Sequence, residues 1–245
     1  WADTVWNPIT GCSKLSPGCE HCYAERIARR LAGRYGYPKD DPFKVTFHPE
    51  RLEEPLRWKK PKRIFCCSMG DLFHDAFKGS PWYWEPVMKV FDYMIMAKQQ
   101  IFFILTKRPQ NMKRFIQAYF CCGKKMPENI HLGVSIENQP TAEERTSILL
   151  QIPAAHLFMS TEPILAKVHL WNDWLKGKTP LSWVILGCET GPGARPMQLD
   201  WAREIRDRCQ MWGVPLFIKQ VSINGKPNKN MDEWPRDLRI REYPK

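Results

Sequence analysis

The sequence lacks the features of a membrane-spanning or secreted protein. No apolar run among its 245 residues approaches the roughly 20 residues that an α-helix needs to cross a bilayer. The first residues, Trp1 to Trp6, carry neither the basic start nor the apolar stretch of a secretory signal. We therefore expect a cytoplasmic protein with no membrane partner.

The sequence also lacks a disulfide framework. Its cysteines number nine, which is odd, and two pairs are adjacent, Cys66 with Cys67 and Cys121 with Cys122. Adjacent cysteines are poor elements of a disulfide scaffold, so reduced thiols and a metal fit the pattern better.

Acidic residues are too few to balance the basic ones. The chain has 37 Lys and Arg residues against 26 Asp and Glu residues, which leaves a formal net charge of +11. Such a charge attracts polyanions, so nucleic acid is the expected partner. Because no zinc finger or RNA-recognition pattern accompanies the basic residues, the alternative is that they form ordinary solvated surface.

Three closely spaced cysteines are the most distinctive feature that is present. Cys12, Cys19 and Cys22 are separated by six residues and then by two, with glycine and proline in and beside the gaps. We expect their thiols to converge on a metal. A structural zinc site needs four protein ligands, and His21, between two of the cysteines, is poorly placed to be the fourth. An iron–sulfur cluster also normally takes four cysteines, so three would leave one iron open to another ligand.

Short apolar runs alternate with longer amphipathic stretches, which is typical of a parallel α/β fold. Helices are expected over 23–31, from Ser80-Pro81, from Pro109 and from Asp200. The alternation predicts a (β/α) barrel of the TIM type, full or partly open, over residues 1–220, and a C-terminal extension of turns and coil over 221–245. The eight expected strands lie at residues 5–9, 44–47, 63–67, 100–105, 131–136, 156–160, 183–186 and 215–218.

Polar side chains follow these strands, at the barrel end where such folds carry their chemistry. A carboxylate there can simply neutralise a neighbouring cation at a crowded rim. The recurrence of glutamate at three strand ends favours a functional site instead. The residues concerned are Ser68, Asp71, Thr106, Lys107, Arg108, Ser135, Glu137, Ser160, Glu162, Glu189 and Lys219.

Several segments resemble a known protein family. They include Trp-Asn-Pro-Ile-Thr-Gly-Cys at 6–12, Gly-Cys-Glu-His-Cys-Tyr-Ala at 18–24, Ser-Thr-Glu-Pro at 160–163 and Gly-Cys-Glu-Thr-Gly at 187–191. Together they are similar to the phage-borne family named after gene products thirty-seven and sixty-eight (DUF5131). The cysteine loop and the helix after it also resemble the cluster loop of the radical S-adenosylmethionine (SAM) superfamily, in which the usual spacing is three residues and then two.

The superfamily resemblance implies a [4Fe-4S] cluster held by Cys12, Cys19 and Cys22, with SAM on the remaining iron. It implies reductive cleavage of SAM to a 5′-deoxyadenosyl radical, supplied with electrons by a donor such as flavodoxin or ferredoxin. The carboxylates suit the ammonium and ribose of SAM, and the cations suit its carboxylate or a phosphorylated substrate. The cofactor-binding set would be Ser68, Asp71, Thr106, Arg108, Ser135, Glu137, Ser160, Glu162 and Glu189, and the catalytic set Glu137, Glu162, Glu189, Lys107 and Lys219.

The expected substrate is a nucleotide or a nucleic acid that is modified or repaired. Two alternatives stay open. One is a zinc-stabilised nucleic-acid-binding protein without catalysis, and the other is a barrel hydrolase that uses two strand-end glutamates as acid and base.

Overall fold

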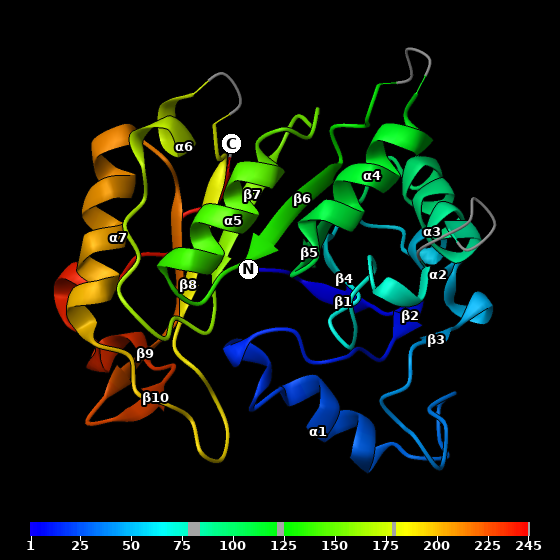
Figure 1. Ribbon diagram of the computed structural model, residues 1–245, viewed down its shortest axis with the longest axis horizontal. Coiled ribbons are helices and arrows are strands. Elements are labelled where there is room, and N and C mark those ends of the chain that lie inside the picture. The colour runs from blue at the N-terminus through cyan, green and yellow to red at the C-terminus, as the bar shows by residue number, and fades with distance from the viewer. Residues whose placement is uncertain (78–83, 122–124, 178–179, 245) are drawn as a thin grey trace.

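The computed structural model describes residues 1–77, 84–121, 125–177 and 180–244. Its centre is an eight-stranded, mostly parallel sheet that curls into a half-barrel (Figure 1). Seven strands run parallel, and the last pairs antiparallel with its neighbour. In spatial order they are β1 (Thr4–Trp6), β4 (Arg63–Cys66), β5 (Ile101–Thr106), β6 (Ile130–Ser135), β7 (Leu157–Thr161), β8 (Trp183–Gly187), β9 (Leu216–Ile223) and β10 (Lys226–Asn228).

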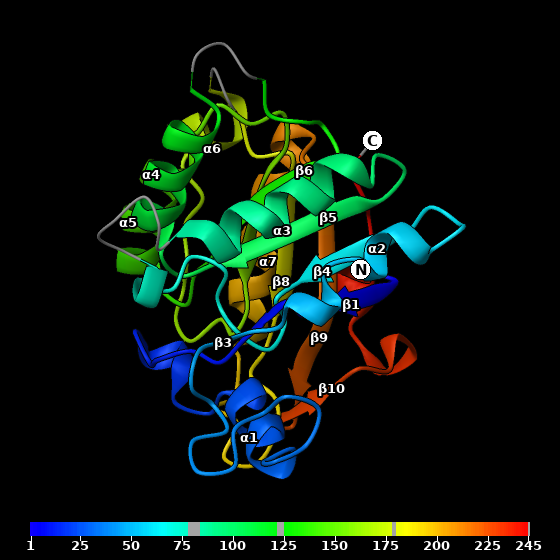
Figure 2. The same ribbon diagram turned by 90° about the vertical axis from the view of Figure 1, so that its right-hand side faces the viewer.

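Helices connect successive strands and cover the outer face of the sheet (Figures 1 and 2). Their apolar faces and the outward residues of the strands form the main core, so that on β5 both Phe102 and Ile104 belong to it. The helices are α2 (Glu54–Arg57) before β4, then α3 (Glu85–Met96), α4 (Pro109–Tyr119), α5 (Gln139–Leu149), α6 (Asn172–Lys176) and α7 (Leu199–Trp212).

The inner face of the half-barrel is filled with rings near the strand starts. We call this cluster the aromatic floor. Gly133 on β6 makes room for it, because a Cβ there would lie 2.5 Å from the ring of Phe158. The floor consists of Phe103, Phe158, Trp183, Ile185 and Phe217, with Trp1 and Leu105 packed against them.

The expected strand at 44–47 does not belong to the barrel sheet, so that part of the prediction was wrong. β3 (Thr46–Phe47) pairs antiparallel with β2 (Ile9–Thr10) in a separate two-stranded sheet. The first expected strand is also divided, into β1 and β2, because Pro8 has no N–H to donate to a ladder. The eighth strand of the main sheet is β10 instead.

The chain after residue 220 contains more regular structure than the turns and coil expected there. β9 continues to Ile223, and β10 returns along it. Two 3₁₀ helices follow, at Met231–Glu233 and Arg236–Leu238. Between and within them, Trp234 and Leu238 are buried in the main core.

The helix expected directly after the cysteines is confirmed as α1 (Tyr23–Arg30), which lies across the carboxyl ends of the strands (Figure 1). The expected helix start at Ser80-Pro81 and the thiol of Cys122 fall outside the described residues. In the four described ranges, none of the helices combines the length and the apolar character needed to cross a membrane.

Candidate functional site

A cavity of about 570 Å³ lies between the cysteine loop, α1 and the carboxyl ends of the strands. All three cysteines of the loop line it. So do most of the polar residues that follow the strands, namely Ser68, Asp71, Thr106, Lys107, Arg108, Ser135, Glu162, Glu189 and Lys219. The curled parallel sheet thus brings residues from distant parts of the sequence to one place.

The three thiols reach this cavity from different local structures. Cys12 follows β2, Cys19 ends the 3₁₀ turn Pro17–Cys19, and Cys22 is the N-cap of α1. Across the described ranges, no group of three or more His, Cys, Asp or Glu side chains is arranged to hold a metal ion. The three cysteines border one cavity but do not form such a group.

Cys12 lies beside a buried guanidinium. Nη1 of Arg108 is 3.4 Å from Cys12 Sγ and 3.2 Å from an Asp71 oxygen, and Nε of Arg108 reaches Asp75 at 3.1 Å. Burial, together with the Asp71 carboxylate, raises the pKa of the Cys12 thiol to about 11 although Arg108 opposes the shift. Cys12 is therefore a thiol at neutral pH, with a cation already in place to stabilise its thiolate.

Cys19 lies beside an ammonium group instead. Nζ of Lys107 is 3.5 Å from Cys19 Sγ. Burial alone would raise the pKa of Cys19, but Lys107 and hydrogen bonds from the Leu15–Ser16 backbone and the Ser16 hydroxyl outweigh it, so the pKa is lowered. The two cysteines thus differ in how readily they ionise, and each has its own cation.

Glu137 is fully buried beneath the cysteine loop and does not line the cavity. Its Oε1 accepts a hydrogen bond from Ser16 Oγ at 2.6 Å and pairs with Lys107 Nζ at 2.5 Å. Arg145 Nη1 of α5 lies 3.3 Å away. Burial opposes ionisation, but Lys107 and Arg145 outweigh it and lower the pKa of Glu137. Glu137 therefore anchors Lys107 and the loop as a buried anion.

Glu189 ties the loop after β8 to the cysteine loop. It accepts two hydrogen bonds from the Arg195 guanidinium, at 2.9 and 2.5 Å, and lies 3.1 Å from His21 Nδ1. Burial opposes ionisation, but the bonds from Arg195 and His21 lower the pKa of Glu189 to about 2. Arg195 also reaches Glu20 at 3.0 Å and the carbonyl of Pro17 at 2.9 Å.

Two further carboxylates stand in the cavity wall. Glu162 pairs with Lys219 Nζ at 2.5 Å and accepts a hydrogen bond from Gln220 at 2.7 Å. Asp71 accepts one from Thr106 Oγ1 at 2.7 Å. Ser160, another residue expected at the site, is buried in β7 and is not in the cavity wall.

The chain matches the family described as "Protein of unknown function (DUF5131)" over residues 1–238. It belongs to this family. The match confirms the family resemblance drawn from the motifs, whereas the likeness to radical SAM proteins stays a prediction. Comparison with curated proteins and with solved structures finds no match.

Ser16, Arg145 and Arg195 make contacts at this site but were not anticipated from the sequence. Arg195 and Ser16 gave no signal, because their contacts depend on how two loops fold against each other. Arg145 did give one: it shares the buried face of α5 with Ala142 and Leu149. A charged residue on an apolar helix face requires a buried partner, which here is Glu137.

Proposed function

We propose that the protein binds a [4Fe-4S] cluster through Cys12, Cys19 and Cys22 and uses SAM to act on a nucleotide or nucleic acid. The observation that carries this proposal is that the three thiols line one cavity together with the charged strand ends. In a cubane cluster each cysteine binds a different iron, so its three ligands border a shared volume and do not meet at one point. The donor set therefore fits the group.

When bound, the cluster would supply the electron that cleaves SAM reductively. The chain's own residues would favour binding of the cluster and of SAM. Arg108 and Lys107 lie 3.4 and 3.5 Å from two of the sulfurs, where positive charge stabilises thiolates. Glu162 and Lys219 present a carboxylate and an ammonium to the cavity, which suits the two charged groups of an amino acid such as that in SAM.

Two of the three strand-end glutamates are poor candidates for the acid of the hydrolase alternative. A glycosidase-type mechanism needs one carboxylic acid that stays protonated near neutral pH. The pKa values of Glu137 and Glu189 are both lowered, and Glu137 lies outside the cavity. The zinc alternative leaves the polar strand ends without a role.

Anaerobic reconstitution with iron and sulfide tests the proposal. We expect about four irons per chain, brown protein, and release of 5′-deoxyadenosine from SAM with dithionite as reductant in place of flavodoxin or ferredoxin. Cys12→Ala, Cys19→Ala and Cys22→Ala should each lose iron and activity. Cys121→Ala is the matched control, because that cysteine is exposed and lies outside the cavity. Colourless, zinc-loaded protein, or variants that match the control, would overturn the proposal.

The choice of nucleic acid as substrate is supported by the net charge of +11. It is tested by adding DNA or RNA to the same assay. We expect nucleic acid to bind and to stimulate SAM cleavage. If neither happens at moderate salt, the substrate assignment fails while the cofactor assignment stands.

A further inference from the structure

The charges that line the cavity do not balance. The cations are Arg26, Lys107, Arg108, Lys219 and Lys229, and the carboxylates are Asp71, Glu162 and Glu189. Lys107, Arg108 and Lys219 each pair with a carboxylate. Within the described part of the chain, the side chains of Arg26 and Lys229 form neither a salt bridge nor a hydrogen bond. These two cations leave the cavity with unneutralised positive charge.

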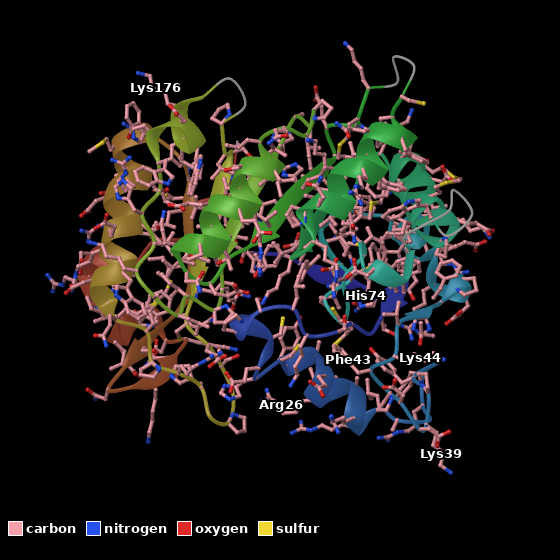
Figure 3. The ribbon with its side chains drawn as sticks, in the orientation of Figure 1. Arg26, Lys39, Phe43, Lys44, His74 and Lys176 are labelled. Atoms are coloured by element: carbon pink, nitrogen blue, oxygen red, sulfur yellow. The ribbon has the colours of Figure 1, made fainter. Side chains whose placement is uncertain are left out.

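Arg26 packs against the loop after β8 and has no carboxylate partner among the described residues. It projects from α1, and its guanidinium lies against the backbone of Gly191, where a Cβ would collide with it. Gly191 also has a φ of +101°, which favours glycine independently. Figure 3 shows Arg26 at the same end of the molecule as Phe43 and Lys44. A guanidinium in a cavity wall without an anionic partner is available to an external anion.

Lys229 reaches the same cavity from the other end of the sequence. It directly follows β10, and its side chain is exposed. Figures 1 and 2 both place α1 and β10 at one end of the molecule, where the carboxyl ends of the strands lie. The two cations therefore lie in the wall of one cavity, at this end of the molecule, although they come from separate elements.

The same cavity has an aromatic wall. Tyr23, Phe43 and Phe65 line it, with Ile27 and Leu105 between polar groups. Aromatic rings stack on nucleobases of any sequence, whereas cations bind the phosphates that link them. A base inside a duplex cannot enter an enclosed cavity unless it leaves the stack.

We propose that Arg26 and Lys229 bind backbone phosphates of a single-stranded polynucleotide, one base of which enters the cavity. This inference rests on the nucleic-acid substrate of the proposed function and gives it a class and two contact residues. The strand crosses the opening from α1 to the segment after β10, and the base lies against the aromatic wall.

Fluorescence anisotropy tests the contacts. The probes are a labelled single-stranded DNA of mixed sequence, the RNA of the same sequence, and the DNA in duplex form, each titrated at several salt concentrations. Arg26→Ala and Lys229→Ala should each weaken single-strand binding about fivefold near physiological salt and reduce the salt slope by about 0.7. Arg26→Lys keeps the charge and should retain most of the affinity. The duplex should bind more weakly than the single strands.

The chain offers a matched control for each variant. Arg30 lies one turn further along α1 and Lys226 lies on β10; both are exposed and neither lines the cavity. Arg30→Ala and Lys226→Ala should change binding by less than about twofold if affinity comes from specific phosphate contacts. Equal weakening by the controls, tighter binding of the duplex, or absence of binding would overturn the inference.

This measurement needs neither cluster nor SAM, so it separates the two proposals. If the paired variants differ as expected but SAM is not cleaved, the enzyme assignment fails and the phosphate contacts stand. If SAM is cleaved but Arg26→Ala and Lys229→Ala bind as their controls do, the phosphate contacts are wrong. Urea unfolding of each variant shows that losses of binding do not come from misfolding.

Discussion

The inner face of the half-barrel has two regions of opposite chemistry. Near the strand starts the aromatic floor packs rings against one another, with Phe103 and Trp183 centroids 5.3 Å apart. Near the strand ends the side chains are charged, and Glu137 and Glu162 each lie 2.5 Å from a lysine. One region is mainly apolar, whereas the other gathers charged groups.

The two regions contribute differently to the protein. Burial of the floor stabilises the fold through apolar area and dispersion, which impose few directional demands. Buried ion pairs contribute little net stability, because desolvation offsets their attraction, but removal of one partner is costly. The floor therefore supplies stability and the strand ends supply positioned charge. Changes in one region should leave the property of the other intact, which can be tested directly.

The largest loss of stability should come from removing a ring of the aromatic floor. Phe158→Ala removes a fully buried ring and should lower the free energy of unfolding by about 4 kcal/mol. Urea unfolding measures the change, and Met211→Ala, at a residue that is 65% exposed, is the control. A loss below about 1 kcal/mol would mean that the cavity collapses and that the floor is not closely packed.

A smaller loss is expected at the strand ends from Glu137→Gln. Lys107 and Arg145 would then be buried without their anion, which should destabilise the protein by about 3 kcal/mol at neutral pH. Because folding lowers the pKa of Glu137, the stability that its charge adds is fully present above the ordinary value of 4.5 and is lost as pH falls through the lower pKa of the folded state.

The difference between wild type and Glu137→Gln should therefore shrink in acid, which urea unfolding across pH would reveal. Glu144→Gln, at an exposed position of α5, is the control. A difference that persists unchanged in strong acid would show that the charge of Glu137 is not responsible.

Adding a methyl group against the aromatic floor should destabilise the protein less. Gly133→Ala places a Cβ 2.5 Å from the Phe158 ring and should destabilise the protein by about 2 kcal/mol. Adding Phe158→Leu should relieve part of the clash, so the double variant should be more stable than the sum of the single losses predicts. Strict additivity would mean that the backbone, and not the ring, absorbs the extra methyl group.

The smallest loss is expected where the two loops meet. Glu189→Gln weakens the pairing with Arg195 and should cost about 1.5 kcal/mol at neutral pH. In wild type this stabilisation is present above pH 4.5 and is lost as pH falls toward about 2, because the folded-state pKa is the lower one. Hydrogen exchange at 17–20 should become faster in the variant, whereas exchange in the floor strands should not change.

The sequence predicts the floor region better than the strand ends. β4 to β8 were expected within two residues of their bounds, since buried parallel strands are continuous apolar runs. β3 was misassigned because two residues carry too little pattern to reveal which sheet they join. Polar strand ends predict that carboxylates and cations lie close together there, but they do not predict the partners: Glu162 pairs with Lys219, Glu137 with Lys107, and Asp71 with Arg108. The contacts of Arg195 and Ser16 could not be predicted, because they depend on loop conformation and loops show no hydrophobic periodicity.

Lys107 and Arg108 are consecutive, yet one approaches Cys19 and the other Cys12. The dipeptide at the end of β5 therefore contacts the cysteine loop at two separate cysteines. One residue inserted after Thr106 would therefore displace both cations from their cysteines at once. No substitution within the cysteine loop would restore both contacts.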